Sequence, residues 1–193
     1  MKKSTLIILA VVAVVVVWAI GGYNGLVSAD EKVSEQWANV ETTYQRRADL
    51  IPNLVNTVKG YASHEQETLQ AVTDARTRAT SITIDPSTAT AEDMERYMAA
   101  QQEVGSALGR LIAVSESYPE LKANQNFLEL QSQLEGTENR ISTERRKYNE
   151  VVKTYNVKVR RFPTNLVASM FGVERKAMFE AQEGAEVAPV VKF

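Results

Sequence analysis

The sequence predicts an all-α protein: an N-terminal transmembrane helix followed by an antiparallel, elongated three- to four-helix bundle. Three observations support this prediction. An unbroken apolar run near the N-terminus is long enough to cross a bilayer. Apolar residues then recur at three- and four-residue spacing, which is typical of helices with one buried stripe. The longest such stretch, Pro119 to Phe162, has no interior proline and would span about 65 Å as one helix.

The composition excludes several classes of function. A length of 193 residues suits one folded domain with a short extra segment. The formal net charge of −2 argues against bulk nucleic-acid binding, which usually needs a basic domain. The chain has no cysteine, so disulfides and thiolate sites are excluded, and His64 is its one histidine. Thr68 stands where a helical zinc motif starting at His64 needs its second histidine, so we predict no metal site and no cofactor.

The first element is a membrane anchor over residues 5–23, after a short cytoplasmic N-terminus of residues 1–4. The anchor contains no charged residue, and its apolar centre from Leu6 to Ile20 is expected to contact the lipid bilayer. Trp18 and Tyr23 lie at its downstream end, where amphipathic aromatic rings favour the membrane interface.

The flanking charges predict the orientation of the anchor. Lys2 and Lys3 precede it, whereas Asp30 and Glu31 are the first charged residues after it. The positive-inside rule therefore places the N-terminus in the cytoplasm and the bulk of the chain outside. A cleaved signal peptide is the alternative, because Val27-Ser28-Ala29 is an acceptable cleavage site.

The helical-bundle domain is predicted over residues 24–182. The glycine-rich stretch from Gly21 to Gly25 is expected to be a flexible joint between the anchor and the bundle. The first helical pattern runs from about Asp30 to Ala79. Pro52 inside this pattern predicts a kink or a restart, with Asp49 as the cap of the restarted helix.

The later elements follow from turn signals. The segment 80–93 is rich in Ser and Thr and predicts a linker, and a third helix follows from about Ala91 to Ser117. A short helix from Leu166 to Phe171 should stop near Gly172, and residues 183–193 are expected to form a mobile tail. Short connections favour an up-down-up arrangement, in which the excess length of the longest helices packs on the short helix or on another subunit.

Polar residues interrupt the apolar seam of the long helix, as at Glu144. Such residues usually fix the register or pair with a facing charge. The pairs that we expect join residues beside the proline to the long helix: Arg47 and Asp49 with Glu138, Arg140 or Glu144.

Residues 145–161 are strongly basic, with Glu150 as the one acid. The cations are Arg145, Arg146, Lys147, Lys153, Lys158, Arg160 and Arg161. They could dock on anionic lipid or an acidic partner. Alternatively, they complement the C-terminal end of a helix dipole and keep the exposed face soluble. In an up-down-up arrangement this end points away from the anchor, which favours the second interpretation.

Short motifs occur in order along nearly the whole chain. They are YNGLV at 23–27, RADLIPNL at 47–54, YPELKAN at 118–124, LEGTENRI at 134–141, RRKYN at 145–149, FP at 162–163 and FE at 179–180. In these motifs the chain closely resembles the LemA family of bacterial membrane-anchored proteins. The resemblance implies a retained anchor and a soluble antiparallel helical bundle, and it implies no particular activity.

We therefore expect a single-pass protein of the bacterial cytoplasmic membrane, with its bundle on the extracytoplasmic side. The expected role is a scaffold or self-assembling interaction protein, whose partners are the bilayer, further copies of itself or another envelope protein. The alternatives are a periplasmic binding module released by signal cleavage and, less favoured, an envelope enzyme whose acid and base are a pair of carboxylates among Asp49, Glu138 and Glu144. The structural or interaction candidates are Arg47, Asp49, Pro52, Glu138, Asn139, Arg140, Glu144, Arg145, Arg146, Arg160 and Arg161.

Overall fold

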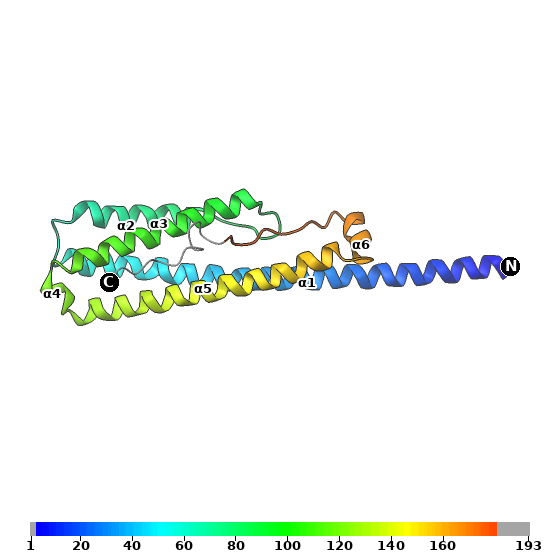
Figure 1. Ribbon diagram of the computed structural model, residues 1–193, viewed down its shortest axis with the longest axis horizontal. Coiled ribbons are helices and arrows are strands. Elements are labelled where there is room, and N and C mark those ends of the chain that lie inside the picture. The colour runs from blue at the N-terminus through cyan, green and yellow to red at the C-terminus, as the bar shows by residue number, and fades with distance from the viewer. Residues whose placement is uncertain (1–2, 181–193) are drawn as a thin grey trace, which may run out of the picture.

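A computed structural model describes residues 3–180, which form six helices and no strand (Figure 1). The helices are α1 (Lys3–Lys59), α2 (Gln66–Ser81), α3 (Ala91–Ser115), α4 (Pro119–Lys122), α5 (Gln125–Arg160) and α6 (Thr164–Met170). The predicted all-α fold with an elongated bundle is confirmed. The tail expected at 183–193 lies outside the described residues.

The anchor and the first helix of the bundle are one continuous helix, so the expected flexible joint is wrong. α1 has 57 residues, about 85 Å of helix, and its N-terminal part is apolar enough to cross a membrane. Gly22 and Gly25 allow close packing instead. A Cβ on Gly22 would lie 3.2 Å from a methyl of Val167, and one on Gly25 would lie 2.9 Å from Nζ of Lys158.

α1 also continues through Pro52, so the expected restart is wrong. Proline lacks the N–H that would donate to the carbonyl of Ala48, and that oxygen accepts a 2.7 Å hydrogen bond from Nε of Arg76 instead. Asp49 caps no helix, because its Oδ1 accepts from the side chain of Gln45 at 2.8 Å.

The chain reverses at residues 60–65, where the sequence pattern predicted continuous helix. His64 therefore lies in a turn. The extra reversal makes the order of the long helices up, down, up, down. α5 consequently runs back along α1 towards the anchor (Figure 1). Lys158 near the end of α5 donates to the carbonyl of Gly25. The expectation that the basic end of this helix points away from the anchor is wrong.

The long helix expected from Pro119 to Phe162 is broken near its start. α4 ends at Lys122, and Asn124 caps α5 by accepting from the backbone N–H of Phe127 at 3.1 Å. The apolar seam within α5 is confirmed. Its buried members are Phe127, Leu134, Thr137, Ile141, Tyr148, Tyr155 and Val159.

The interior consists of two apolar clusters, one nearer the anchor and one at the far end. The near cluster centres on Trp37, whose ring lies 5.5 Å from that of Tyr97, 5.4 Å from Tyr148 and 5.9 Å from Phe179. The far cluster includes Leu54 and Leu111, both fully buried. Arg47 and Gln101 are buried between the two clusters.

The predicted short helix and its stop are confirmed. α6 ends at Met170, and Gly172 adopts φ +64°, a left-handed conformation that glycine adopts without a Cβ clash. α6 packs on both α1 and α5, which confirms that the excess length of the long helices packs on the short helix. Beyond it, residues 173–180 form a strap without helix that runs back along the bundle (Figure 1).

Candidate functional site

The polar layer around Arg47 is the first candidate site. Arg47 is 3% exposed. Its Nη1 donates to Oε1 of Glu138 at 2.6 Å, and its Nη2 donates to the backbone oxygen and Oε1 of Gln101 at 3.0 and 2.6 Å. The expected pair between Arg47 and Glu138 is therefore present. A buried guanidinium needs such partners, because an unpaired charge away from water is strongly unfavourable.

The tyrosines beside this layer are held in their neutral form. The guanidinium of Arg47 lies 5.2 Å from the ring centre of Tyr44. Burial raises the pKa of Tyr44. Burial also raises the pKa of Tyr97, and the electrostatic effect of the neighbouring Tyr44 raises it further. A tyrosine with a raised pKa keeps its proton at neutral pH, so both hydroxyls beside the layer are neutral.

The remaining expected pairs are absent from the described residues. Asp49 and Arg140 are exposed and form no ion pair in residues 3–180. Glu144 accepts from Lys147 at 2.9 Å and from Gln36 of α1 at 2.7 Å. The hydrogen bond from Lys147 and, to a smaller extent, that from Gln36 hold the pKa of Glu144 below its ordinary value.

The carboxylates of the enzyme alternative do not meet in one cavity of the described bundle. Asp49 lines a shallow depression with Leu50 and Gln133, whereas Glu138 lines a different groove. Glu144 instead accepts hydrogen bonds from Lys147 and Gln36. Pro52 and Asn139, the other candidates of the family motifs, are exposed on α1 and α5.

An open groove of about 350 Å³ runs between α3 and α5. Met98, Gln102, Gly105 and Ser106 contribute from α3, while Glu138, Ile141 and Arg145 contribute from α5, with Arg47 behind them. A Cβ on Gly105 would meet no atom within 4 Å. The groove is therefore open beside this residue of α3.

The strap is held by two asparagines of α5 that the sequence analysis missed. Asn156 accepts from the backbone N–H of Lys176 at 2.8 Å and donates to its carbonyl at 2.9 Å. Asn149 makes the same pair of bonds with Phe179, both at 2.8 Å. The signal was visible, because Tyr-Asn recurs after seven residues at 148–149 and 155–156.

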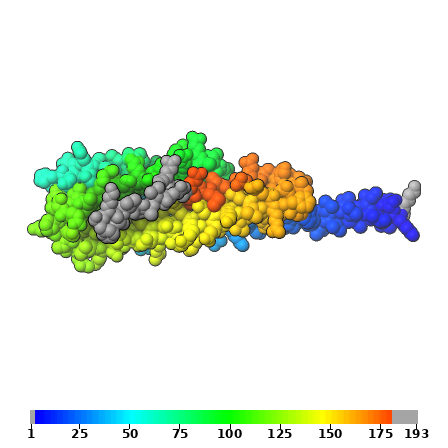
Figure 2. Space-filling model, viewed as in Figure 1, coloured from blue at the N-terminus to red at the C-terminus, as the bar shows by residue number. Residues whose placement is uncertain are grey.

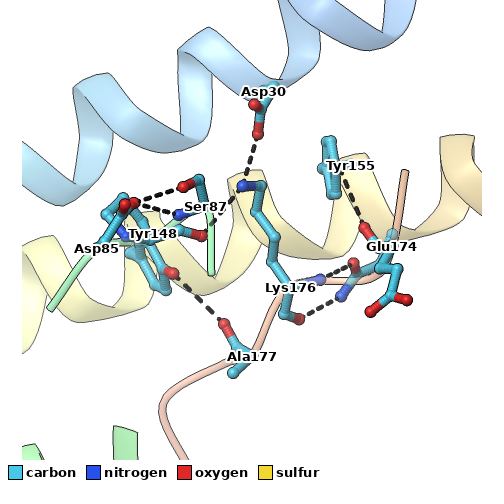
Figure 3. A network of polar contacts seen from close by, with 10 residues as sticks. Asp30, Asp85, Ser87, Tyr148, Tyr155, Glu174, Lys176 and Ala177 are labelled. Carbon is cyan, nitrogen blue, oxygen red and sulfur yellow. Dashed lines mark hydrogen bonds and ion pairs between the residues drawn. The ribbon is translucent and has the colours of Figure 1, made fainter. Parts of the chain in front are cut away.

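The tyrosines of the same repeat also hold the strap. The hydroxyl of Tyr155 donates to the carbonyl of Glu174 at 3.1 Å, and that of Tyr148 to Ala177 at 3.4 Å (Figure 3). Burial raises the pKa of Tyr148 to about 12, so this hydroxyl keeps its proton at physiological pH. Each Tyr-Asn pair thus binds the backbone of the strap, independently of its side chains.

Lys176 anchors the strap from its other side. Its Nζ lies 2.6 Å from Oδ1 of Asp30 on α1 and donates to the carbonyl of Pro86 at 3.0 Å (Figure 3). The side chain of Lys176 is 6% exposed and that of Asp30 is 41% exposed. One buried ammonium therefore joins α1, the loop at 82–90 and the strap.

The basic candidates are divided between two places. The guanidinium of Arg145 lies 4.9 Å from the ring centre of Phe179, so it helps to cover the strap, while Arg146 is exposed. Arg160 and Arg161 are exposed at the end of α5. Figure 2 shows this end and α6, in orange, gathered where the narrow anchor leaves the bundle.

Known proteins resemble the chain over most of its length. A family model described as the LemA family matches residues 36–193. Magnetosome proteins MamQ 1 and MamQ 2 of Paramagnetospirillum magneticum are each 26% identical to it over 186 residues, which cover 88% of this chain and 68% of theirs. Protein LemA of Metamycoplasma hominis is 25% identical over 164 residues, or 85% of this chain and 71% of its own.

Proposed function

This chain belongs to the LemA family, and from that premise we propose that it acts as a membrane-anchored scaffold of the bacterial cell envelope. In this role it presents the surface of its bundle to further copies of itself or to another envelope protein. We also propose that it is not an enzyme. The bundle faces the extracytoplasmic side of the cytoplasmic membrane, as the charges that flank the anchor indicate.

The observation that carries the proposal is the unbroken course of α1. A flexible joint would let a folded domain rotate freely above the membrane, whereas a continuous helix holds it at one height and orientation. α1 extends from the anchor to the far end of the bundle without interruption. A rigid mount of this kind suits a protein that presents a binding surface at a fixed distance from the bilayer.

The pairing of the polar groups supports a role without catalysis. Arg47 pairs with Glu138, and Glu144 accepts hydrogen bonds from other residues of the bundle. General acid–base catalysis needs a group whose pKa lies near the working pH, and the pKa of Glu144 is moved away from neutrality. Glu138 and Glu144 are therefore engaged in contacts that hold the helices together.

The groove between α3 and α5 is the surface at which this proposal is best tested. A photo-crosslinking residue at Gln102, which lines the groove, should capture a second copy of the chain or an envelope protein in intact cells. Gln70 is the matched control, because it is an exposed glutamine on the outer side of α2. Captured proteins are identified by mass spectrometry.

Self-assembly is tested on the full chain in mild detergent. A mass several times that of the 21.4 kDa chain is expected. The scaffold proposal fails if the chain is a monomer under these conditions and Gln102 captures nothing that Gln70 does not also capture.

The released-module alternative makes a different prediction about the N-terminus. Cleavage after Ala29 would remove Leu26, which is 1% exposed in the near cluster, and Gly22, which packs against Val167. Loss of these contacts would open the base of the bundle, so the geometry favours retention of the anchor. Sequencing the mature N-terminus distinguishes the two, since a start at Asp30 would show that the anchor is removed.

A further inference from the structure

The end of the bundle beside the anchor carries large apolar side chains of which the described chain leaves at least half exposed. They are Phe162, Leu166, Met170 and Phe171, which are 75%, 51%, 76% and 55% exposed. The opposite face of α6 is buried through Val167 and Ala168. Four neighbouring apolar side chains at one end of a molecule indicate an interaction surface rather than scattered exposure.

This surface lies at the level where the membrane anchor ends. α6 crosses the bundle at the point where the bare part of α1 begins (Figure 1). The ring of Phe171 lies 4.6 Å from that of Tyr23, the last residue of the predicted anchor. Trp18 lies little more than one turn deeper on α1, so these aromatic rings share the interfacial depth that tryptophan and tyrosine favour.

A basic pocket of about 400 Å³ adjoins the apolar side chains. Its cations are Lys153, Arg160, Arg161 and Arg175, its apolar edges are Val157 and Met178, and no acid lines it. Among residues 3–180, none of these four cations forms an ion pair. Guanidinium groups gathered without a carboxylate match the oxygens of a phosphate group.

A helix dipole does not account for this pocket. Cations that complement the C-terminal end of α5 should belong to its last turn, as Arg160 does. Arg161 follows the helix, and Arg175 comes from the strap. The fold therefore brings cations from two segments to one place.

We propose that α6 and this pocket form a second membrane contact, which binds anionic phospholipids of the leaflet from which the chain's own anchor emerges. The apolar side chains enter the boundary between headgroups and acyl chains, and the cations hold the lipid phosphates. Amphipathic elements with this division of apolar and basic groups bind at bilayer surfaces. Since the anchor keeps the surface beside the bilayer at high effective concentration, even weak individual contacts are populated.

The test uses the full chain in vesicles and exploits the absence of cysteine. Ser169→Cys places an environment-sensitive fluorophore on the exposed face of α6, and Ser132→Cys places it on an exposed position of α5 far from the anchor. The vesicles contain phosphatidylcholine alone or with phosphatidylglycerol, and both carry a lipid with a quencher near its headgroup. The label at Ser169 should be quenched, more strongly with phosphatidylglycerol, and the label at Ser132 should not.

Charge neutralisation separates binding from mere proximity. Arg160→Gln with Arg161→Gln should lower the ratio of docked to undocked protein in anionic vesicles about fivefold for each charge removed. Lys59→Gln with Arg110→Gln removes the same charge at the far end and should change nothing. Equal quenching at Ser169 in both kinds of vesicle, or quenching insensitive to the arginines, would overturn the proposal. A label at Ser169 that is shielded from water but not quenched by the lipid would also overturn the proposal, because protein rather than lipid would then cover the surface.

Discussion

Nε of Arg76 donates a 2.7 Å hydrogen bond to the carbonyl oxygen of Ala48. In an uninterrupted helix this oxygen accepts from the N–H of residue 52, which is proline in this chain. A side chain of α2 thus replaces the bond that α1 lacks. The same contact joins α1 to α2 directly beside the polar layer of Arg47.

The first prediction is that Arg76 matters because of Pro52. Arg76→Met should lower the free energy of unfolding by about 1–2 kcal/mol, since it leaves the Ala48 carbonyl without a partner. In a Pro52→Ala background the cost should largely disappear, because the alanine N–H takes that carbonyl. Denaturant unfolding of the four variants in detergent gives the coupling as a double-mutant cycle.

Arg78→Met is the matched control for this cycle. Arg78 lies on the same helix, is half-exposed and pairs with Glu103, so its loss should cost much less than that of Arg76, as for other exposed pairs. That cost should be the same with Pro52 or Ala at position 52. Independence of Arg76 and Pro52 would contradict the proposed replacement of the helix bond.

The second prediction concerns the strap. Asn156→Ala removes both hydrogen bonds to the backbone of Lys176, so the strap should open more often. Trypsin should then cut after Arg175 or Lys176 at least about fivefold faster, in line with the loss of about 1–3 kcal/mol for unsatisfied buried groups. Asn139→Ala is the control, since Asn139 is an exposed asparagine of the same helix. Equal cleavage rates in the two variants would refute the role of Asn156.

The third prediction distinguishes two adjacent glycines of α1. Gly22→Leu should push α6 away, because even a Cβ at this position lies 3.2 Å from Val167. Gly21→Leu meets open space and should keep or raise the melting temperature, since leucine favours helix more than glycine does, by up to about 1 kcal/mol. Thermal unfolding followed by circular dichroism in detergent measures both. A lower melting temperature for Gly21→Leu than for Gly22→Leu would contradict this packing.

The fourth prediction concerns acid. The pKa of Glu144 is lowered in the folded protein by its hydrogen bonds with Lys147 and Gln36. The folded state therefore holds its proton less tightly than the unfolded state, and this contribution to stability is present above the unfolded value of 4.5. It is lost as the pH falls through the lowered value.

The acid prediction is measured as melting temperature against pH. Glu144→Gln should melt at a lower temperature than the parent protein at pH 7, and the difference should shrink towards pH 3. Glu150→Gln, an exposed neighbour on α5, supplies the control and should show a smaller difference at both values. A constant difference for Glu144→Gln would show that the ionised carboxylate does not stabilise the fold.

Much of the local structure could be predicted from the sequence. The capped start of α3 at Ala91, the stop of α6 at Gly172 and the buried face of α5 depend on residues near one another in the chain. Of the candidate site, the pairing of Arg47 with Glu138 could be anticipated, because a charge beside an apolar stripe needs a facing partner. The Tyr-Asn repeat could have been noticed, but its ligand, an extended backbone, leaves no pattern of its own.

The failed expectations have a common cause. Pro52 predicts a kink or a restart, but α1 continues through it, and Arg76 of another helix donates to the Ala48 carbonyl that the proline leaves without its helix partner. The glycines from Gly21 to Gly25 predict flexibility unless other helices pack on them, as α6 does on Gly22 and α5 on Gly25. In both cases the local preference is overridden by a contact between residues far apart in the sequence.

The sequence by itself determined the all-α class, the apolar N-terminal span and the family, because periodicity, apolar length and short motifs are properties of neighbouring residues. The tertiary structure decided which helix ends lie beside one another. The reversal at residues 60–65 changes the direction of every later helix, and it thereby brings the basic end of α5 to the anchor. Whether a helical pattern continues or turns there depends on the packing of α2 against α1 and α3. Such packing is settled only when the whole bundle buries its apolar faces together.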